Sequence, residues 1–407
     1  MPTYLTPGVY VEEKPGGPRP IEALGTSTAS FIGEAPDPIA HQNQPKAVNN
    51  WSQFLKEFAP EGSTSTPLAQ AVFGFFLNGG TRCYILNIGK EGALSGTKGI
   101  AQLEKVDEIA IVAAPGYSDP ASFESVLSHC EKMKDRVAIL DAPQHVSDIN
   151  RLTQVATASA TSSDDQKDDE GDDDAPTSSF VSSAPETGLR PRQSDGGYGA
   201  FYFPWIVARD PLSSNDLIET PPSGHIAGIY ARTDFTRGVH KAPANEAIRG
   251  ALDVTYRVTH DEQGELNSNG VNAIRLFSSE GIRVWGARTL AASASEWRYL
   301  NVRRLFAMIE ASLARSTRWV VFEPNDVPLW KSIKRDISAF LTLLWRQGAL
   351  MGRTPEEAFF VQCDEETNPP EVVDSGSVVV VIGMAPVKPA EFVIFRISQT
   401  AAGAELE

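Results

Sequence analysis

The sequence predicts a mixed α/β protein that consists of two α/β domains and a short β-strand arm at each end of the chain. Two observations support the domains. Strand-like apolar runs alternate with helical patterns between Thr28 and Leu140, as in an α/β layer. Helical periodicity then dominates from Ser295 to Gln347. A third observation supports the arms, because strand-like segments bordered by prolines lie near both termini, at Gly8–Glu13 and Phe392–Ile397.

The N-terminal arm is predicted from five prolines within residues 1–20, which exclude a helix there. Its one alternating strand includes Val9, Tyr10, Val11 and Glu12. A strand isolated in this way has no hairpin partner nearby. It must therefore pair at long range or with another chain.

The α/β layer follows from the pattern of apolar residues. Strands are predicted at Thr28–Gly33, Cys83–Ile88, Ile109–Ala113 and Val137–Leu140. Helices are predicted over Trp51–Phe58, Leu68–Leu77 and Phe123–Met133. Asn49 or Asn50 is a suitable N-cap for the first helix, and Asn78-Gly79-Gly80 ends the second.

An acidic segment interrupts this pattern between Ala156 and Gly197. Eight acidic residues and one lysine stand between Asp164 and Asp174, a net charge of −7. Few apolar residues are present, so we expect a disordered surface loop. The carboxylates lack the order of calcium ligands in an EF-hand, and a solvated acidic run explains them better.

The C-terminal half returns to regular patterns. Its predicted strands and helices are Ala200–Val207, a small helix at Ala247–Leu252, a strand region at Ile282–Trp285 and Leu290, a helix at Glu296–Leu313, a strand at Trp319–Phe322 and a helix at Pro328–Gln347. The last helix has an apolar face at 3–4 spacing and a basic face with Lys331, Lys334 and Arg335.

Two strand-like runs end the chain, Val378–Ile382 and Phe392–Ile397, separated by Pro386 and Pro389. In the second run both faces are apolar, because Phe392 and Ile394 alternate with Val393, Phe395 and Ile397. Such a strand either enters the sheet of its own domain or is exchanged between subunits, since an unpaired strand edge is a template for another chain.

Composition narrows the possible functions. The chain has 407 residues and a net charge of −16, which disfavours nucleic acid as a partner. Residues 270–352, however, carry twelve basic against six acidic side chains. Three cysteines without CxxC spacing predict no zinc site and a reducing compartment. We find neither a secretion signal nor an apolar run long enough to cross a membrane, so no membrane insertion is expected.

Catalytic and cofactor motifs are not found either. The sequence has no HExxH, GxSxG, GxxxxGK[ST] or strand-linked GxGxxG pattern, so no catalytic residue, metal or cofactor is predicted. His225, the pair His240-Lys241, and His260 beside Asp261-Glu262 are interpreted as structural or surface residues. An enzyme is still possible on this ground alone, because catalytic residues can assemble in space.

Several passages together resemble the phage tail sheath family, which includes sheaths of contractile injection systems. They run from Thr6 to Ile397 and read TPGVYVEE, TSTASFIGEA, FFLNGGTRCYILNI, PPSGHIAGIYARTD, GVHKAPAN, GIRVWGARTL, EWRYLNVRRLF and GMAPVKPAEFVIFRI. The acidic insertion departs from compact members of that family.

The resemblance implies a non-enzymatic subunit that stacks in hexameric rings around an inner tube and shortens to drive the tube through a target envelope. Its partners would be its own copies, the tube protein, the baseplate and tail-terminator or cap proteins. It would assemble in the cytoplasm of the producing cell as part of a virion tail or tail-like particle. Contraction would need no nucleotide, because the extended form stores its energy at assembly.

The resemblance also suggests roles for the puzzling segments. The strands at residues 9–12 and 392–397 would join sheets of neighbouring subunits, and proline-containing linkers would let the rings rotate. Lys331, Lys334 and Arg335 would face the tube. The expected organisation is an arm (1–22), an outer α/β domain (23–265), an inner tube-facing domain (266–385) and a second arm (386–407). The alternatives are an α/β hydrolase with an unrecognised site, or an acidic surface or adhesive protein.

Overall fold

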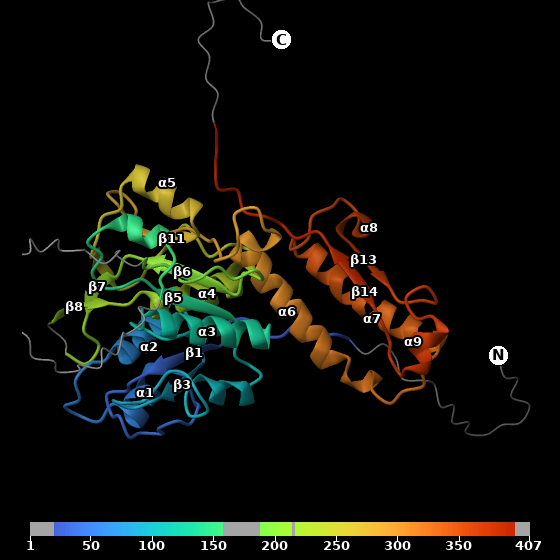
Figure 1. Ribbon diagram of the computed structural model, residues 1–407, viewed down its shortest axis with the longest axis horizontal. Helices are drawn as coiled ribbons and strands as arrows, with labels where there is room; N and C mark the ends of the chain where they lie inside the picture. Colours follow the sequence, from blue (N-terminus) through green and yellow to red (C-terminus); the bar gives the residue numbers. More distant parts are fainter. Residues whose placement is uncertain (1–19, 158–187, 214–215, 395–407) are drawn as a thin grey trace, which may run out of the picture.

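The computed structural model describes residues 20–157, 188–213 and 216–394. The predicted strand residues Val9–Glu12, Phe395 and Ile397 lie outside this range, as does the acidic run Asp164–Asp174. Figure 1 shows a large sheet with helices on both faces and a smaller, mainly helical part beside it. The mixed α/β class is as predicted.

The largest sheet within the described residues has nine strands. In spatial order they are β2 (Lys46–Val48), β3 (Cys83–Asn87), β1 (Ala29–Gly33), β4 (Ile111–Ala113), β5 (Val137–Asp141), β6 (Gly199–Phe203), β11 (Val271–Phe277), β12 (Gly281–Trp285) and β9 (Glu246–Ala247). The pairs from β3 to β11 are parallel, and the outer pairs are antiparallel. A parallel centre needs cover on both faces.

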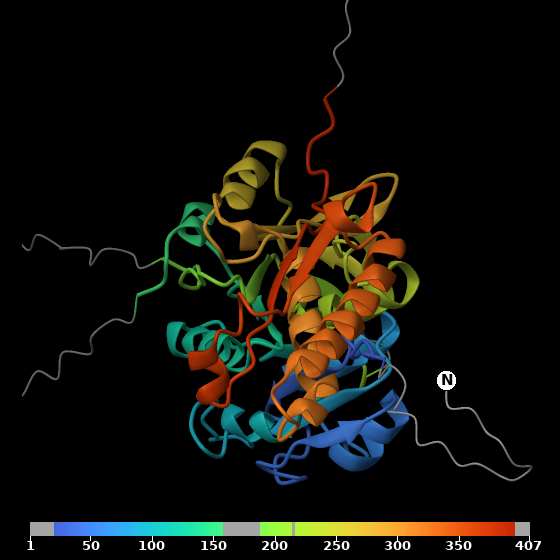
Figure 2. The same ribbon diagram turned by 90° about the vertical axis from the view of Figure 1, so that its right-hand side faces the viewer.

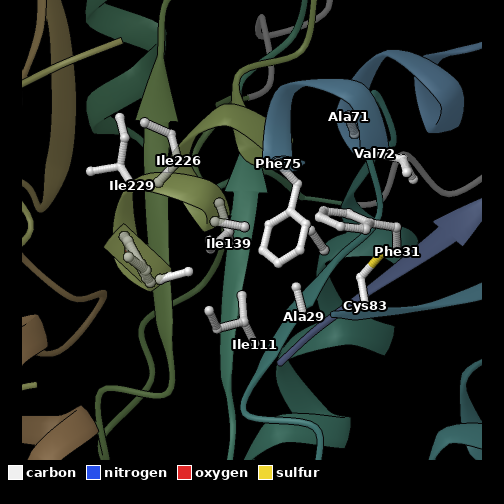
Figure 3. Close-up of a cluster of buried hydrophobic side chains, with 14 of the residues drawn as sticks. Ala29, Phe31, Ala71, Val72, Phe75, Cys83, Ile111, Ile139, Ile226 and Ile229 are labelled. Carbon is white, nitrogen blue, oxygen red and sulfur yellow. The ribbon is translucent and has the colours of Figure 1, made fainter. Parts of the chain in front are cut away.

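That cover consists of two apolar cores, one on each face of the sheet. Along β1, Phe31 belongs to one core and its neighbour Ile32 to the other, as the period of two requires. Helices α1 (Trp51–Phe58), α2 (Pro67–Leu77) and α4 (Ser223–Arg237) cover the first face. Helices α3 (Pro120–Met133) and α5 (His260–Ser268) cover the second. Figure 3 shows the first core, where the rings of Phe31 and Phe75 meet edge to face.

Helices α2 and α4 pack with their backbones in close contact. A Cβ atom at Gly224 would lie 2.2 Å from the Cα of Ala71, and one at Gly228 would lie 2.5 Å from the carbonyl oxygen of Phe75. Real side chains cannot occupy these positions without a shift of the backbone. Glycine is therefore required where α4 crosses α2. A small antiparallel sheet of β10 (Ala251–Val254), β7 (Ile206–Arg209) and β8 (Leu217–Thr220) adjoins this part of the protein.

A third core holds the C-terminal part together. It is built by α6 (Leu300–Ser316) and α7 (Val327–Arg346), with the short helices α8 (Pro355–Ala358) and α9 (Pro370–Asp374) and the paired strands β13 (Phe359–Gln362) and β14 (Val381–Met384) nearby. We call residues 300–387 the helical unit and residues 25–290 the sheet unit. Figure 2 shows the helical unit in front of the sheet unit.

The structure corrects the predicted domain boundary at residue 265. Strand β11 pairs with β6 and with β12, so residues 271–285 belong to the nine-stranded sheet. The change of core comes at the start of α6 instead. The N-terminal boundary moves as well, because Ile21 is buried in the third core. The inner and outer placement of these units remains a prediction.

Three local predictions are also wrong. Residues 247–252 form the end of β9, a turn at Gly250 with φ of 87°, and the start of β10, where a helix was expected. Residues 318–320 form a 3-10 turn rather than a strand. Residues 188–197, expected to belong to a disordered loop, are held by the fold, because Arg192 forms ion pairs with Glu124 and Glu131 on α3.

Candidate functional site

The sheet formed by β13 and β14 has two strands, and the described chain supplies no third one. Its antiparallel register pairs Phe359 with Met384 at one end and Gln362 with Val381 at the other. An isolated pair of strands is marginally stable in water, and each strand here leaves one edge of N–H and C=O groups unpaired by another strand. These edges are suited to additional strands.

The two faces of this small sheet differ sharply. Val361, Ile382 and Met384 pack on the third core. On the other face the ring of Phe360 lies against Gly383, where an added Cβ would be 2.1 Å from the ring, and this phenylalanine is 56% exposed. Val381 is 42% exposed beside it. An exposed apolar face next to open edges is typical of a protein interaction surface.

The C-terminal residues of the described chain are exposed as well. Phe392, Val393 and Ile394 belong to no strand within it and are 73%, 72% and 79% exposed. Their pairing with another subunit therefore remains a prediction. The preceding strand runs from Val381 to Met384, three residues later than the sequence indicated for its start. Val378 and Val380 instead pack against the third core.

The C-terminal arm begins later than predicted. We expected it to start at residue 386, but Pro386 bridges to Leu350 and the backbone N–H of Val387 donates to Ala349 at 3.3 Å. Glu391 then forms an ion pair with Arg288, with 2.6 Å between Nη2 and Oε2. Residues 386–391 are thus held by the rest of the subunit, and the exposed segment starts at Phe392.

Helix α7 presents the predicted basic face. Lys331, Lys334 and Arg335 are all exposed, opposite the buried Ile333 and Ile337. Arg335 donates through Nε to Asp336 Oδ1 at 2.9 Å. Within the described chain, neither lysine has a carboxylate within 4.0 Å. Two of the three cations are therefore available to an acidic partner.

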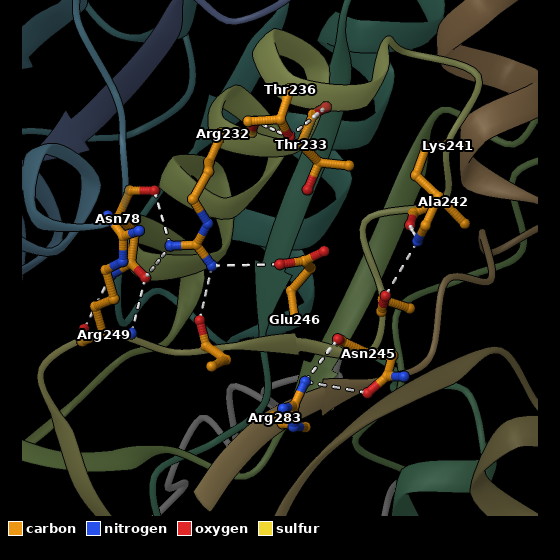
Figure 4. A network of polar contacts seen from close by, with 12 residues as sticks. Asn78, Arg232, Thr233, Thr236, Lys241, Ala242, Asn245, Glu246, Arg249 and Arg283 are labelled. Carbon is orange, nitrogen blue, oxygen red and sulfur yellow. Dashed lines mark hydrogen bonds and ion pairs between the residues drawn. The ribbon is translucent and has the colours of Figure 1, made fainter. Parts of the chain in front are cut away.

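Lys241, Glu262 and His225, which the sequence singled out, have structural roles. Lys241 Nζ donates to the carbonyl oxygens of Ala242 and Ala244, at 2.5 and 3.3 Å, and so braces the loop after α4 (Figure 4). Glu262 closes a capping box with Thr259 at the start of α5. His225 is buried between α4 and α2, and burial lowers its pKa to about 4, so its ring is neutral.

Two arginines extend this polar network, one to the loop after α4 and one to the end of α2. Arg283 on β12 donates to the backbone oxygen of Asn245 at 2.9 Å, and Arg232 on α4 donates to the backbone oxygen of Asn78 at 3.1 Å (Figure 4). The Oε2 atom of Glu246 lies 3.7 Å from Nη2 of Arg232. Both guanidinium groups donate to backbone oxygens, which makes this polar network part of the scaffold.

No group of three or more His, Cys, Asp or Glu side chains is placed to hold a metal ion among residues 20–157, 188–213 and 216–394. In the same ranges, every helix is too short or too polar to cross a membrane.

Comparison with known proteins identifies relatives along most of the chain. Residues 192–290 match the family model of the phage tail sheath protein central domain, and residues 292–400 match that of the phage tail sheath C-terminal domain. The boundary between these matches falls just after β12, where the sheet unit ends. The comparisons give no support to the α/β hydrolase alternative.

Solved structures match over almost the full length. The sheath of the extracellular contractile injection system PVC, in its contracted state, is 30% identical with a TM-score of 0.75, covering 98% of this chain and 99% of that one. The helical sheath of the anti-feeding prophage, also contracted, is 28% identical with a TM-score of 0.74, covering 98% of this chain and all of that one.

The curated relatives match over only part of their length. The tail sheath protein of Vibrio phage KVP40 is 29% identical over 188 residues, which is 46% of this chain and 27% of that protein. The chain spans at most about half the length of the curated relatives it matches, with the largest share 48%.

Proposed function

The chain belongs to the phage tail sheath family, and from this premise we propose that it is the structural subunit of a contractile sheath. Copies of it stack as hexameric rings around an inner tube. The stack then shortens and drives the tube through a target envelope, with no catalytic step in the subunit itself. The helical sheath among its relatives supports this assignment.

The observation that carries the proposal is the incomplete β13–β14 sheet together with an exposed apolar segment at Phe392–Ile394. A sheet with free edges needs strands, and a terminal segment with alternating apolar side chains supplies one. Exchange in a single direction passes from subunit to subunit without closing, which generates a helical polymer. Val9–Glu12 is the second strand offered to a neighbour.

The tube contact is assigned to the basic face of α7. Lys331, Lys334 and Arg335 carry three positive charges on one exposed helix face of an acidic protein. Exposed ion pairs contribute about 0–1 kcal/mol each, so many weak pairs hold the sheath on the tube and still release it on contraction. Baseplate and terminator proteins close the two ends of the stack, and assembly takes place in the cytoplasm of the producing cell.

Electron microscopy of the purified chain and two truncations tests the assembly role. The full chain should form long tubular polymers. A chain ending at Glu391 keeps the folded part but lacks the proposed strand, and it should stay as small soluble species. The matched control ends at Ser398, keeps that strand, and should polymerise. Tubes formed by the chain ending at Glu391 would contradict strand exchange through the C-terminus.

Charge reversal tests the tube contact. Changing Lys331, Lys334 and Arg335 to Glu should give empty or contracted sheaths when the sheath is assembled with its tube, while pairing between sheath subunits survives. The matched control reverses Lys56, Lys90 and Lys98, three exposed lysines of the sheet unit. Extended, tube-filled particles from the α7 variant at ordinary salt would place the contact elsewhere.

A further inference from the structure

Five residues, Val387–Glu391, connect the helical unit to the exposed C-terminal segment, and we call them the arm root. They follow β14 and cross the junction between the helical unit and the sheet unit. Two polar contacts mark the ends of this crossing, one at Val387 and one at Glu391. Both use side chains that have no other assigned role.

Asn301 makes the first contact. It lies in the first turn of α6 and is 2% exposed. Its Nδ2 donates to the backbone oxygen of Val387 at 3.1 Å and to that of His240, in the loop after α4, at 2.8 Å. One amide group therefore ties the arm root, the start of α6 and the sheet unit together. A hydrogen bond protected from water in this way is more persistent than one at the surface.

Arg288 makes the second contact. Its Nε donates to Glu391 Oε1 at 2.9 Å and its Nη2 to Oε2 at 2.6 Å, a two-point arrangement with side chains only 9% and 17% exposed. Tyr299 adds its hydroxyl to Oε2 at 3.3 Å. Burial alone would raise the pKa of Glu391, but the hydrogen bond and the charge of Arg288 keep that pKa below its ordinary value. The carboxylate is therefore ionised at neutral pH.

Arg288 is itself held in place. The buried Asn272 on β11 accepts from the backbone N–H of Arg288 at 2.7 Å and donates to its carbonyl oxygen at 2.8 Å. Nη1 of Arg288 donates to the backbone oxygen of Asn267, in the last turn of α5, at 2.9 Å. Asn272 thus holds the backbone of Arg288 and Asn267 holds its guanidinium, and together they set the position of the carboxylate that Arg288 binds.

We propose that Arg288, Tyr299 and Asn301 form a clamp that fixes the arm root to its own subunit and so determines where the exchanged C-terminal strand leaves it. This inference rests on the proposed function and extends it to particular positioning residues. The strand given to a neighbour is then tied to its donor at two points, to the start of α6 through Asn301 and to the sheet unit through Arg288.

The clamp has a geometric consequence. An extended chain covers about 3.3–3.6 Å per residue, so releasing these five residues would lengthen the free tether by at most about 17 Å. A longer and looser tether lowers the effective concentration of the strand at its acceptor edge and allows many relative positions of the two subunits. With the clamp closed, the slack is removed and the position of the neighbour is defined.

Two variants of the full chain test this, Glu391→Gln and Tyr299→Phe, with Glu310→Gln as the matched control. Glu310 also forms an ion pair, with Arg303 on α6, but its side chain is 47% exposed and it lies nine residues beyond Asn301 along that helix. Amide hydrogen exchange at residues 387–393 should accelerate on the order of tenfold in Glu391→Gln and less in Tyr299→Phe. The Glu310 variant should exchange like the wild type there.

Electron microscopy of the same proteins gives the second readout. Glu391→Gln should form shorter sheaths with poorer helical order, whereas Glu310→Gln should form normal ones. Unchanged exchange in Glu391→Gln would show that no clamp exists. Faster exchange with normal sheaths would show that the clamp does not position the strand. A wild-type chain that forms no tubes would contradict the proposed function, and the exchange data would still decide whether the arm root is clamped.

Discussion

Asp234→Ala should strongly destabilise the junction between the two units. Asp234 on α4 and Arg304 on α6 form an ion pair with 7% and 3% of their side chains exposed and 2.5 Å between Oδ2 and Nη2. Arg304 also donates to the backbone oxygen of Thr26 at 3.1 Å, and its guanidinium lies 4.6 Å from the centre of the Tyr230 ring. The pair thus joins α4, α6 and the N-terminal segment.

The expected loss of unfolding free energy follows from the burial of this pair. Removing the carboxylate leaves the guanidinium buried without its counter-charge, which costs about 3–5 kcal/mol. Replacing both partners by apolar residues, as in Asp234→Leu with Arg304→Met, should recover most of that loss, because an apolar pair of similar volume needs no desolvation of charge. Glu310→Gln breaks a half-exposed pair and should cost about 0–1 kcal/mol.

Urea unfolding, followed by circular dichroism, measures these differences. The four proteins compared are the wild type, Asp234→Ala, the double variant and Glu310→Gln. A domain protein has about 5–15 kcal/mol of stability in total, so the midpoint of Asp234→Ala should fall well below that of Glu310→Gln. The reasoning is refuted if Asp234→Ala loses less than about 1 kcal/mol, within the range of an exposed pair. It is equally refuted if the double variant is no more stable than the single one.

Three further predictions concern packing and pH. Gly228→Ala should lose about 1–3 kcal/mol in urea unfolding, because its Cβ would meet a backbone oxygen at 2.5 Å, whereas Gly264→Ala in α5, with nothing within 4 Å, should gain about 0.5–1 kcal/mol. Burial raises the pKa of Asp141 from 3.8 to about 6, so its contribution to stability is present at low pH and declines by about 2–3 kcal/mol as pH rises from 4 to 7. Measuring the unfolding free energy of the wild type and of Asp141→Asn from pH 4 to 7 checks this prediction. A difference between the two proteins that does not vary with pH would contradict it. The pKa of Glu391 is lowered instead, so its contact with Arg288 should persist above pH 4.5 and be lost as pH falls further, with faster hydrogen exchange of the arm root as the readout.

Sequence patterns predicted two kinds of element: strands that are buried on both faces, and helices with one buried apolar face and one exposed polar face. The strands around Phe31 and Ile111 and the amphipathic helix α7 were found within a few residues of their bounds. Helix α4 was missed because it is buried on nearly all sides, between the sheet and α2, and therefore has no polar face to produce a 3.6-residue period. The assignment of β11 to the wrong domain has a different cause, since its parallel partner β6 lies about 70 residues earlier and leaves no local signal.

The candidate site divides in the same way. Periodicity in α7 was sufficient to predict that Lys331, Lys334 and Arg335 share one exposed face. Nothing local marks the contact of Arg288 with Glu391, because 103 residues separate them and a single charged residue forms no motif. Proline content even suggested a free linker at residues 386–391. The fold overrides that tendency by supplying acceptors and donors at Ala349, Asn301 and Arg288.

Both arms are attached through α6, and this has a mechanical consequence for the proposed sheath. At the C-terminal end of this helix, Ser312 accepts a hydrogen bond from the backbone N–H of Leu24 at 2.9 Å, just after Ile21 enters the third core. At its N-terminal end, Asn301 holds the root of the other arm. The two positions are eleven residues apart in the helix, about 16 Å along its axis.

An α-helix is far stiffer than a loop of that length. A displacement of one arm is therefore transmitted to the other arm. Because Arg304 fixes the same helix to α4, the sheet unit must turn with it. Contraction that passes from ring to ring requires this kind of connection, in which the displacement of one neighbour reorients the subunit and its second arm together.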